Sequence, residues 1–543
     1  MTFSKLGTFT LASFGTLLLS SVAFAGTPSV DLVPDALDPQ ACNGQGCWTN
    51  HLRVTDIDGD GDLDILLANY GDFFQGNDNP QPLVVYVNDG NAGFSNNSAE
   101  AVGNYAGNLR QIAVGDVDGD GSPDIYGPSG NGDAHVLFIN DGSGVFTDEA
   151  DARLPSDYPS GAAARMADVD NDGDLDIFAA DGYPNGSPYG HLYINDGSGV
   201  FVEADGAIPG TISGVAIDDV EFFDADRDFD LDLIVNAHSN GIGALWFNDG
   251  SGNFSAGGSI APMADMHFHY NVAACDVDND GDLDLWIDNI GGNFTEQLQI
   301  NDGNGNFTYV AGVFPPPTDC TLWGEFGDLN GDNRTDLVTG QGECTSSDEV
   351  YLGNSQVPVD STGPKILAAE PLPADIPAGG PTLRFAVSDR TVTDEGPRLA
   401  MAYALVDPDG AATVLPATFM GGDLFRVGLP APDSMITFQL CAEDRAGNVT
   451  CGDSQSYGED AGTTGDTTTG DTTGGTTGDT TGDTTSDTTS DTSAGTDDDI
   501  GADGGDGGDG CNCSTGGDSD TPTGLLAWMG LGLLGLGLRR NRR

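Results

Sequence analysis

The sequence predicts an all-β chain: a β-propeller of six four-stranded blades, with seven as the alternative count, then a small β-sandwich and a disordered tail. Three observations support this prediction. A nine-residue pattern rich in aspartate occurs six times, about 50 to 60 residues apart. An Asn-Asp-Gly pattern follows each of the first five copies. Gly and Asp are so frequent that many tight turns, and hence many short strands, are expected.

The chain begins with a predicted signal peptide, residues 1–25. Lys5 gives a positive start, Leu6 to Val22 is mostly apolar, and Ala23-Phe24-Ala25 is a small-residue cleavage site. The alternative is a retained membrane anchor. The interrupted apolar run disfavours it, because a membrane span needs about 20 residues.

The propeller is predicted over residues 26–358. In each repeat one strand enters the aspartate loop, a second such as DILLAN leaves it, a third leads into the Asn-Asp-Gly turn and a fourth follows. Asn, Asp and Gly suit that turn because they tolerate positive φ. The strands that leave the loops are nearly continuous in apolar residues, as expected for strands covered on both faces. The loops begin at Asp56 (DIDGDGDLD), Asp116 (DVDGDGSPD), Asp168 (DVDNDGDLD), Asp224 (DADRDFDLD), Asp276 (DVDNDGDLD) and Asp328 (DLNGDNRTD).

The segment from Ser29 to Leu37 is predicted to complete the last blade. The sixth repeat reaches only YLGN, from Tyr351, and therefore lacks a fourth strand. The sequence SVDLVPDAL resembles a spare fourth strand and would close the ring. The alternative, an open solenoid, would need end caps that the sequence does not show.

The aspartate loops are predicted calcium sites. Side chains at loop positions 1, 3, 5 and 9 can converge on one point with the backbone carbonyl of position 7, an arrangement that suits a cation taking six to eight oxygens. A plain acidic turn is the alternative. Two carboxylates about 4 Å apart repel by roughly 1 kcal/mol in water and roughly 4 kcal/mol at an effective dielectric of 20, so an empty loop should be distorted.

We therefore predict Ca²⁺ as the cofactor. The candidate ligands, taken at positions 1, 3, 5, 7 and 9 of the six loops, are Asp56, Asp58, Asp60, Asp62 and Asp64; Asp116, Asp118, Asp120, Ser122 and Asp124; Asp168, Asp170, Asp172, Asp174 and Asp176; Asp224, Asp226, Asp228, Asp230 and Asp232; Asp276, Asp278, Asp280, Asp282 and Asp284; and Asp328, Asn330, Asp332, Arg334 and Asp336.

The six loops are not expected to be equal. Position 6 is glycine in four of them, which lets the loop turn sharply. The fourth loop has Phe229 there, and we expect it to bind weakly. The sixth has Asn330 at position 3 and Asn333 at position 6, and it remains plausible because asparagine can adopt the left-handed conformation.

Three further segments follow the repeats. Residues 363–456 alternate apolar and polar residues and predict a small β-sandwich. Residues 458–510 are mostly Thr, Gly, Asp and Ser and predict a disordered linker. Residues 511–543 hold Cys511-Asn-Cys513, an apolar run from Leu525 to Leu538 and closing arginines. The run is short for a membrane span, so we predict a sorting tail, with a permanent transmembrane anchor as the alternative.

The cysteines fit an exported protein. Cys42 with Cys47, Cys320 with Cys344 and Cys441 with Cys451 predict three local disulfides in an oxidising compartment. Cys275 is left over and is predicted to be a buried thiol.

Charge and motif content exclude several classes of function. The chain has 86 Asp plus Glu against 17 Lys plus Arg, which makes nucleic acid and anionic lipid poor partners. It contains no HExxH, no GxSxG and no phosphate-binding loop, and we do not predict an enzyme. His267 and His269 would share one face of a strand, but a surface or turn pair is the favoured interpretation.

The repeated motifs resemble FG-GAP/VCBS repeats, which occur in the integrin alpha-subunit propeller and in many bacterial exoproteins. The resemblance covers about Ser29 to Asn354 and implies a calcium-stabilised propeller whose ligands are the aspartates at positions 1, 3, 5 and 9. Integrin-type propellers have seven blades, so a count of six departs from that pattern. The Cys-x-Cys, apolar and arginine tail resembles the MYXO-CTERM sorting signal, which implies surface anchoring near Cys511 or Cys513. The sandwich resembles Ig-like domains of bacterial surface proteins.

These observations predict an exported protein located at the cell surface (the outer membrane) or outside the cell. The favoured function is an adhesion module that binds an extracellular glycan or protein on the face carrying the variable connections, with membrane contact only through the sorting tail. Exposed aromatics such as Tyr183, Tyr189 and Tyr270 could stack on sugars. The alternatives are a passive structural surface component and a polysaccharide-active enzyme; the scarcity of Lys and Arg in the propeller disfavours the enzyme.

Overall fold

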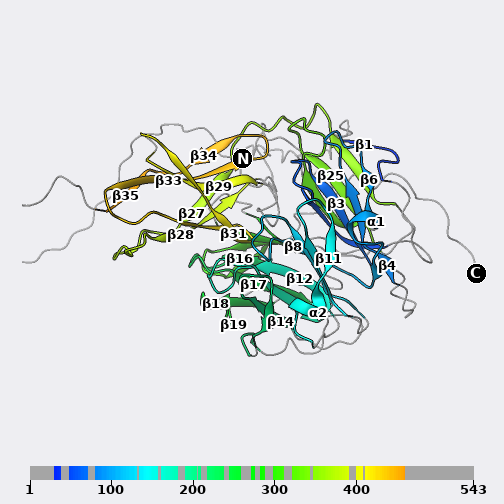
Figure 1. The fold of residues 1–543 in the computed structure, drawn as a ribbon, viewed down its shortest axis with the longest axis horizontal. Helices are drawn as coiled ribbons and strands as arrows, with labels where there is room; N and C mark the ends of the chain where they lie inside the picture. The colour runs from blue at the N-terminus through cyan, green and yellow to red at the C-terminus, as the bar shows by residue number, and fades with distance from the viewer. Residues whose placement is uncertain are drawn as a thin grey trace, which may run out of the picture.

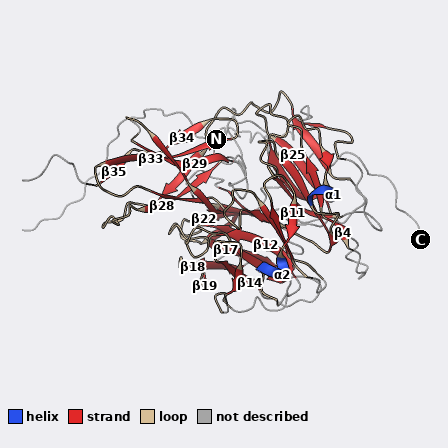
Figure 2. Ribbon diagram, viewed as in Figure 1, coloured by secondary structure: helices blue, strands red, loops and turns tan. Residues whose placement is uncertain are grey.

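The computed structural model is built almost entirely of β-strands (Figures 1 and 2). Two one-turn helices, α1 (Ser98–Ala101) and α2 (Ala150–Arg153), accompany them. Among the described residues, no helix is long and apolar enough to cross a membrane. The structure describes residues 30–37, 48–70, 80–130, 134–156, 161–181, 190–204, 206–209, 217–237, 244–258, 271–275, 282–287, 297–310, 321–342, 347–389, 399–407 and 410–458.

Six four-stranded antiparallel sheets, which we call blades 1 to 6, follow one another along the first part of the chain. Blades 1 to 3 consist of β2 (Thr49–Thr55), β3 (Asp64–Asn69), β5 (Val84–Val87) and β6 (Ser95–Asn96); β8 (Ala113–Gly115), β9 (Asp124–Gly127), β10 (Val136–Asn140) and β11 (Phe146–Asp148); and β12 (Gly161–Ala167), β13 (Asp176–Asp181), β14 (Gly190–Asn195) and β15 (Phe201–Glu203).

Blades 4 to 6 repeat the same plan. They consist of β16 (Ile217–Phe223), β17 (Asp232–Ala237), β18 (Ala244–Asn248) and β19 (Phe254–Ala256); β20 (Val272–Cys275), β21 (Asp284–Ile287), β22 (Gln297–Asn301) and β23 (Phe307–Val310); and β24 (Thr321–Gly327), β25 (Asp336–Gln341), β26 (Glu349–Gly353) and β1 (Val30–Leu32). A small ladder of β4 (Gln81–Pro82) and β7 (Ala106–Gly107) lies beside blade 1. The described residues contain no seventh blade, and the predicted four-stranded repeats are confirmed.

The N-terminal strand completes the sixth blade, as predicted. Strand β1 pairs antiparallel with β26, with Val30 opposite Gly353 and Leu32 opposite Tyr351. Just after β1, the Val33 N–H donates to the Val350 carbonyl at 2.9 Å. The first and last parts of the repeat region therefore share one sheet.

Neighbouring blades pack through apolar side chains. Strands that leave the loops, such as β3, are buried along their whole length, as the apolar runs predicted. Separate buried clusters join blade 1 to blade 2, blade 2 to 3, blade 3 to 4 and blade 4 to 5, and a fifth joins blade 6 to blade 1. Between blades 5 and 6, Asn271 donates to the Leu322 carbonyl. The arrangement is consistent with propeller blades.

The first, inner strands of four blades, β2, β12, β16 and β24, carry buried charge. These inner strands contact one another: β2 contacts β24, and β12 contacts β8 and β16. Arg53 in β2 pairs with Glu325 in β24 at 2.7 Å. Arg165 in β12 is 1% exposed and pairs with Asp219 (3.1 Å) and Glu221 (3.4 Å) in β16. Ion pairs across blade boundaries therefore replace apolar packing along these strands.

The residues that follow blade 6 form two antiparallel sheets packed face to face. One cluster of buried apolar side chains lies between the two sheets. Its members include Phe385, Phe425, Val427 and Phe438. We call this pair of sheets the sandwich; its Ig-like character remains a prediction. The sheets are β27 (Lys365–Ala369), β28 (Thr382–Ser388), β32 (Leu424–Gly428) and β31 (Thr418–Gly421), and β30 (Thr413–Pro416), β29 (Leu399–Val406), β33 (Ile436–Asp444), β34 (Val449–Cys451) and β35 (Gln455–Tyr457).

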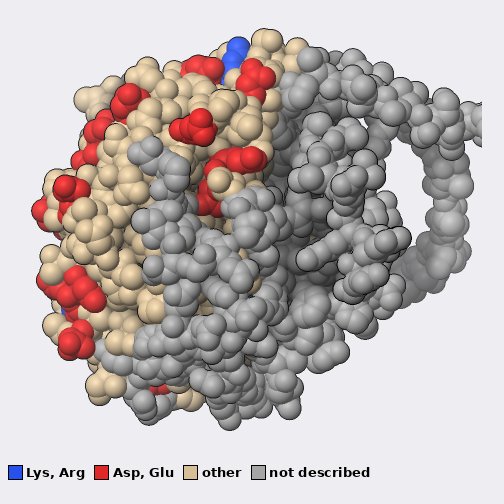
Figure 3. Space-filling model, turned by 90° about the vertical axis from the view of Figure 1, so that its right-hand side faces the viewer, with Lys and Arg blue, Asp and Glu red and all other residues tan. Residues whose placement is uncertain are grey.

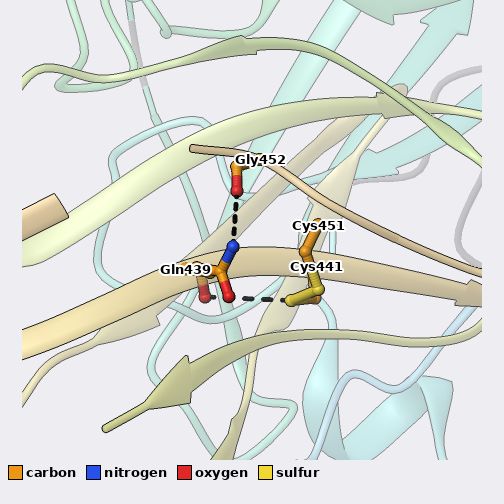
Figure 4. Close-up of a disulfide and its surroundings, with 4 residues drawn as sticks. All are labelled: Gln439, Cys441, Cys451 and Gly452. Carbon is orange, nitrogen blue, oxygen red and sulfur yellow. Dashed lines mark hydrogen bonds between the residues drawn. A yellow bond between two sulfur atoms is a disulfide. The ribbon is translucent and has the colours of Figure 1, made fainter. Parts of the chain in front are cut away.

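One predicted disulfide is present. Cys441 in β33 bonds to Cys451 in β34, and Gln439 of the same strand donates to the Gly452 carbonyl at 3.0 Å (Figure 4). The other two predicted pairs lie outside the described residues, as do the signal peptide, the linker from residue 459 and the sorting tail.

The sandwich docks on the blades through the hairpin formed by β31 and β32. Met420 is fully buried in one cluster with side chains of blades 3 and 4, and its carbonyl accepts the Asp168 N–H at 2.6 Å. A Cβ on Gly421 would lie 3.0 Å from the Ala167 Cα, and one on Gly422 would lie 2.4 Å from the Phe222 carbonyl oxygen. Only glycines allow an approach this close.

Candidate metal centres

Each aspartate loop joins the inner strand of a blade to its second strand. Position 1 follows the inner strand directly, and position 9 is the first residue of the next strand, as Thr55 and Asp64 show in blade 1. We number the loops 1 to 6 in chain order. In loop 5, positions 1, 3 and 5 (Asp276, Asp278 and Asp280) lie outside the described residues.

The carboxylate at position 9 connects the start of the loop with the Asn-Asp-Gly turn of the same blade. In loop 1, the Asp64 carboxylate accepts the Ile57 N–H at 3.0 Å and the Asn88 N–H at 2.8 Å. Burial raises the pKa of Asp64 to about 7 and that of Asp232 to about 9. A nearby cation would keep such buried carboxylates ionised. The same two bonds recur at Asp124, Asp176, Asp232 and Asp336.

Positions 1 and 5 shape the loop itself. The Asp56 carboxylate accepts the N–H groups of Gly59 (2.9 Å) and Gly61 (3.0 Å), and Asp60 accepts the Asp62 N–H at 2.9 Å. These bonds fold the backbone around the carboxylates. They recur with small variations in loops 2, 3, 4 and 6.

Position 3 holds the decisive atoms. The Oδ1 atoms of Asp58, Asp118 and Asp226 are buried and have no hydrogen-bond partner. Burial is also the main cause that raises the pKa of each of these carboxyl groups. The same atom is unsatisfied at the same place in three loops. Because buried polar atoms almost always have a partner, this recurrence indicates a ligand that these oxygens contact.

Four loops bring three carboxylates together within 4.8 Å of one another. Oxygen atoms at this separation can bind one hard cation. The groups are Asp56, Asp58 and Asp64; Asp116, Asp118 and Asp120; Asp168, Asp170 and Asp176; and Asp224, Asp226 and Asp232. A further group, Asp360, Asp389 and Asp444, lies where the segment after blade 6 meets the sandwich.

Other predicted ligands are placed differently. In loop 6, the Asn330 side chain accepts the Asp332 N–H at 2.9 Å, and the Arg334 guanidinium donates to the Val357 carbonyl. In loop 5, Asp282 pairs with Arg227 of loop 4. Position 7 side chains, which include Asp62, Ser122, Asp174 and Asp230, lie outside these groups of three.

Phe229 does not alter the backbone of loop 4. Its φ is +67°, and its N–H donates to Asp224 at 3.0 Å, as Gly61 does to Asp56 in loop 1. Asn333 in loop 6 has a φ of +58°, as predicted. At this positive φ, Phe229 is held in the left-handed conformation, which a phenylalanine rarely adopts. The weak cation binding that we predict for this loop rests on that strain.

The asparagine of each Asn-Asp-Gly turn has a function that the sequence did not reveal. Its backbone is not in the positive-φ region, and the glycine two residues later takes that conformation instead. The Asn195 side-chain amide donates to Val117 O at 2.7 Å and Leu175 O at 3.0 Å, in two different loops. Its recurrence in five repeats was the available signal, but turn preference already accounted for it.

Arginines of the sandwich reach the loops. Arg384 pairs with Asp230 and donates to the Phe229 carbonyl (2.6 Å) in loop 4 and to Asn171 (3.1 Å) in loop 3. The Arg426 guanidinium lies 3.7 Å from the Asp168 carboxylate, and Arg445 donates to the Gly61 carbonyl at 3.3 Å. The sandwich therefore covers part of the end of the blades at which the loops lie.

Four segments of the chain match the model of the FG-GAP-like repeat. They are residues 46–127, 129–179, 168–235 and 231–287. Cartilage acidic protein 1 of Xenopus tropicalis is 26% identical over 313 residues, which are 52% of this chain and 47% of that protein. The chain thus spans about half the length of this relative. The resemblance to FG-GAP repeats is confirmed, and the resemblance of the tail to a sorting signal remains a prediction.

Proposed function

We propose that the chain is an exported, surface-located module that binds an extracellular glycan or protein and whose propeller is stabilised by calcium. The observation that carries the metal assignment is the unsatisfied Oδ1 atom at position 3 of three loops. The FG-GAP-like repeats and the cartilage acidic protein relative support a binding module rather than an enzyme.

The residues present fit a hard divalent cation. The three grouped positions, which are 1, 3 and 9 in loops 1, 3 and 4 and 1, 3 and 5 in loop 2, offer carboxylate oxygens only. In loop 1, backbone N–H groups hold positions 1 and 9 in place. When bound, calcium would supply the positive charge that these clustered carboxylates lack. The loop residues themselves order the turn between the first two strands of a blade, so binding energy becomes folding energy.

The binding surface is proposed for the end of the blades opposite the loops. Inner strands run toward the aspartate loops, and third strands run toward the Asn-Asp-Gly turns, so both sets of turns share one end. The sandwich occupies part of that end through Met420 and Arg384. The predicted aromatic residues Tyr183, Tyr189 and Tyr270 belong to the variable connections between strands and lie outside the described residues.

The surface charge limits which partners fit. On the face shown in Figure 3, Asp and Glu side chains greatly outnumber Lys and Arg. Neutral glycans or proteins with basic patches suit this surface better than polyanions. Saturable binding to a panel of glycans and matrix proteins in calcium would support the adhesion proposal, and the absence of binding to any of them would favour a passive surface component.

Thermal unfolding of the chain without its predicted signal peptide tests the metal assignment. We expect the melting temperature to be higher in calcium than in EDTA. Replacing Asp118 with Asn should remove one site and lower the calcium-dependent stabilisation by up to about 2.7 kcal/mol when calcium is 100-fold above its Kd. Asp151→Asn removes the same charge from an exposed helix and is the control. Equal melting temperatures in calcium and EDTA would refute the assignment.

A further inference from the structure

One side-chain amide connects two adjacent loops. Asn195 is 3% exposed, and its Nδ2 donates both to Val117 O, at position 2 of loop 2, and to Leu175 O, at position 8 of loop 3. A side-chain amide carries two hydrogens, so both bonds can exist at once. Asn195 therefore joins the loop of its own blade to the loop of the preceding blade.

The same connection is made at four other boundaries. In each case the amide donates to position 2 of the preceding loop and to position 8 of its own loop, at 2.8 to 3.2 Å. The asparagines and their acceptors are Asn140 with Ile57 and Pro123, Asn248 with Val169 and Leu231, Asn301 with Ala225 and Leu283, and Asn88 with Leu329 and Leu63.

The carbonyls that accept these bonds lie among the candidate metal ligands. Position 2 stands between the ligands at positions 1 and 3, and position 8 stands between positions 7 and 9. The Asn195 backbone N–H also donates to the position 9 carboxylate of Asp176 at 2.8 Å. A change in the backbone of either loop therefore acts directly on the asparagine that both share.

The series of connections is open at one boundary. In blade 6, Gly353 occupies the place of the asparagine, because its N–H donates to the position 9 carboxylate of Asp336 as the Asn88 N–H does to Asp64. Glycine has no side-chain amide that could make the two bonds. A Cβ at this place would lie 2.6 Å from the Thr335 carbonyl oxygen. Among the described residues, the asparagine connections therefore run 6–1–2–3–4–5, and none of them joins loop 5 to loop 6.

We propose that the asparagine of each Asn-Asp-Gly turn is a positioning residue that couples cation binding at two neighbouring loops. The proposal rests on the calcium assignment made above. A cation that orders one loop also fixes the carbonyl held by the shared asparagine, so the next loop loses less conformational freedom when it binds in turn. Cation binding is then positively cooperative along the series. Within each connected pair, either loop changes the affinity of the other by the same factor.

Hydrogen exchange of loop 2 during a calcium titration tests this coupling. The probe is calcium alone, and the readout is the calcium concentration that half-protects the amides of residues 116–124. Asp170→Asn disables loop 3. We expect it to raise the loop 2 midpoint at least threefold in the otherwise unsubstituted chain. Charge alone predicts the opposite direction. Loop 3 without its cation is more negative than loop 3 with it, and this extra negative potential would attract the cation to loop 2 and lower its midpoint.

The asparagine itself is tested by a double-mutant comparison. When Asn195→Ala is already present, adding Asp170→Asn should no longer shift the calcium midpoint of loop 2. The control is Asn91→Ala, because the amide of this exposed asparagine donates within its own turn, to Asp89 O at 3.0 Å. The shift should persist in the control. A shift that also persists in Asn195→Ala would overturn the proposal and leave the asparagine a purely structural link.

The open boundary supplies a test that leaves every asparagine in place. Asp328→Asn disables loop 6, and we expect the midpoint of loop 1 to rise while that of loop 5 stays unchanged. Equal shifts in loops 1 and 5 would overturn the proposal. If calcium protects no loop in the unsubstituted chain, the calcium assignment and the coupling fall together, whereas protection with independent midpoints overturns the coupling alone.

Discussion

At the scale of single residues, His51 shows how burial beside positive charge fixes a protonation state. Its ring is fully buried in β2, 4.3 Å from the Trp323 ring, and Nδ1 accepts the Ile112 N–H at 3.4 Å. Burial, followed by the charges of Arg53 and Arg165, lowers its pKa well below the usual value. The ring is therefore neutral in the folded chain at neutral pH.

A pH dependence follows from this lowered pKa. The unfolded chain binds a proton at His51 near pH 6.5 and the folded chain does not, so the stabilisation from the neutral ring is lost as the pH falls below 6.5. We expect the stability difference between the original chain and His51→Gln to shrink between pH 7.5 and pH 5.5. Urea unfolding in EDTA at several pH values measures it. A pH-independent difference would contradict the lowered pKa.

The limits of sequence-based prediction are clearest at single residues. Asp56, Asp58 and Asp64 were predicted as one group because their spacing along a tight loop is local, and the structure brings them together. The role of Asn195 was missed because its acceptor Val117 lies 78 residues away. A contact of that range depends on how blades stack, which no local pattern encodes.

At the scale of elements, the inner strands β2 and β24 are joined by a buried ion pair. Arg53 and Glu325 lie 2.7 Å apart, with side chains 8% and 6% exposed. Glu325 also accepts the Val54 N–H at 2.7 Å. A charge buried to this degree is costly once its partner is removed, even where the intact pair adds little net stability.

A double-mutant cycle tests this pair. Arg53→Met should cost about 3 to 5 kcal/mol of unfolding free energy, because it leaves Glu325 buried without a cation. Adding Glu325→Leu should recover much of that loss. Chemical unfolding of the two single variants and the double variant measures the coupling. Additive losses in the double variant would show that the two side chains act independently.

The strands and turns were predictable because their signals are periodic and local. Apolar runs such as DILLAN became buried second strands, and SVDLVPDAL supplied the closing strand β1. The alternating pattern also predicted a sandwich. The sequence of β31 gave no comparable sign that Met420 would pack against blades 3 and 4, because an apolar residue in this strand suits the sandwich core equally well.

At the scale of the whole molecule, Arg384 links the sandwich to the blades. Its guanidinium is shared between Glu370 of the sandwich, at 3.2 Å, and the contacts to loops 3 and 4. We expect Arg384→Gln to weaken docking by about 1 to 3 kcal/mol, because charge-assisted hydrogen bonds are lost. Limited proteolysis of residues 354–364, the segment that connects blade 6 to the sandwich, should then be faster.

Glu370→Gln provides the matched comparison for that prediction. It removes the partner within the sandwich and leaves the contacts of Arg384 to Phe229 and Asp230 in place. Proteolysis of residues 354–364 should be nearly unchanged in this variant. If both substitutions accelerate cleavage equally, Arg384 acts by stabilising the sandwich rather than by holding it against the loops.

The pairing of β1 with β26 sets the order in which the molecule can be completed. Strand β1 precedes every other strand of the blades along the chain, yet Gly353, the partner of Val30, is 323 residues further on. The earliest strand must therefore wait until nearly the whole repeat region has arrived. Long waits of this kind slow folding and leave a strand edge exposed to other chains. A chain truncated before Gly353 would leave that edge unpaired, so we expect premature termination to yield aggregates.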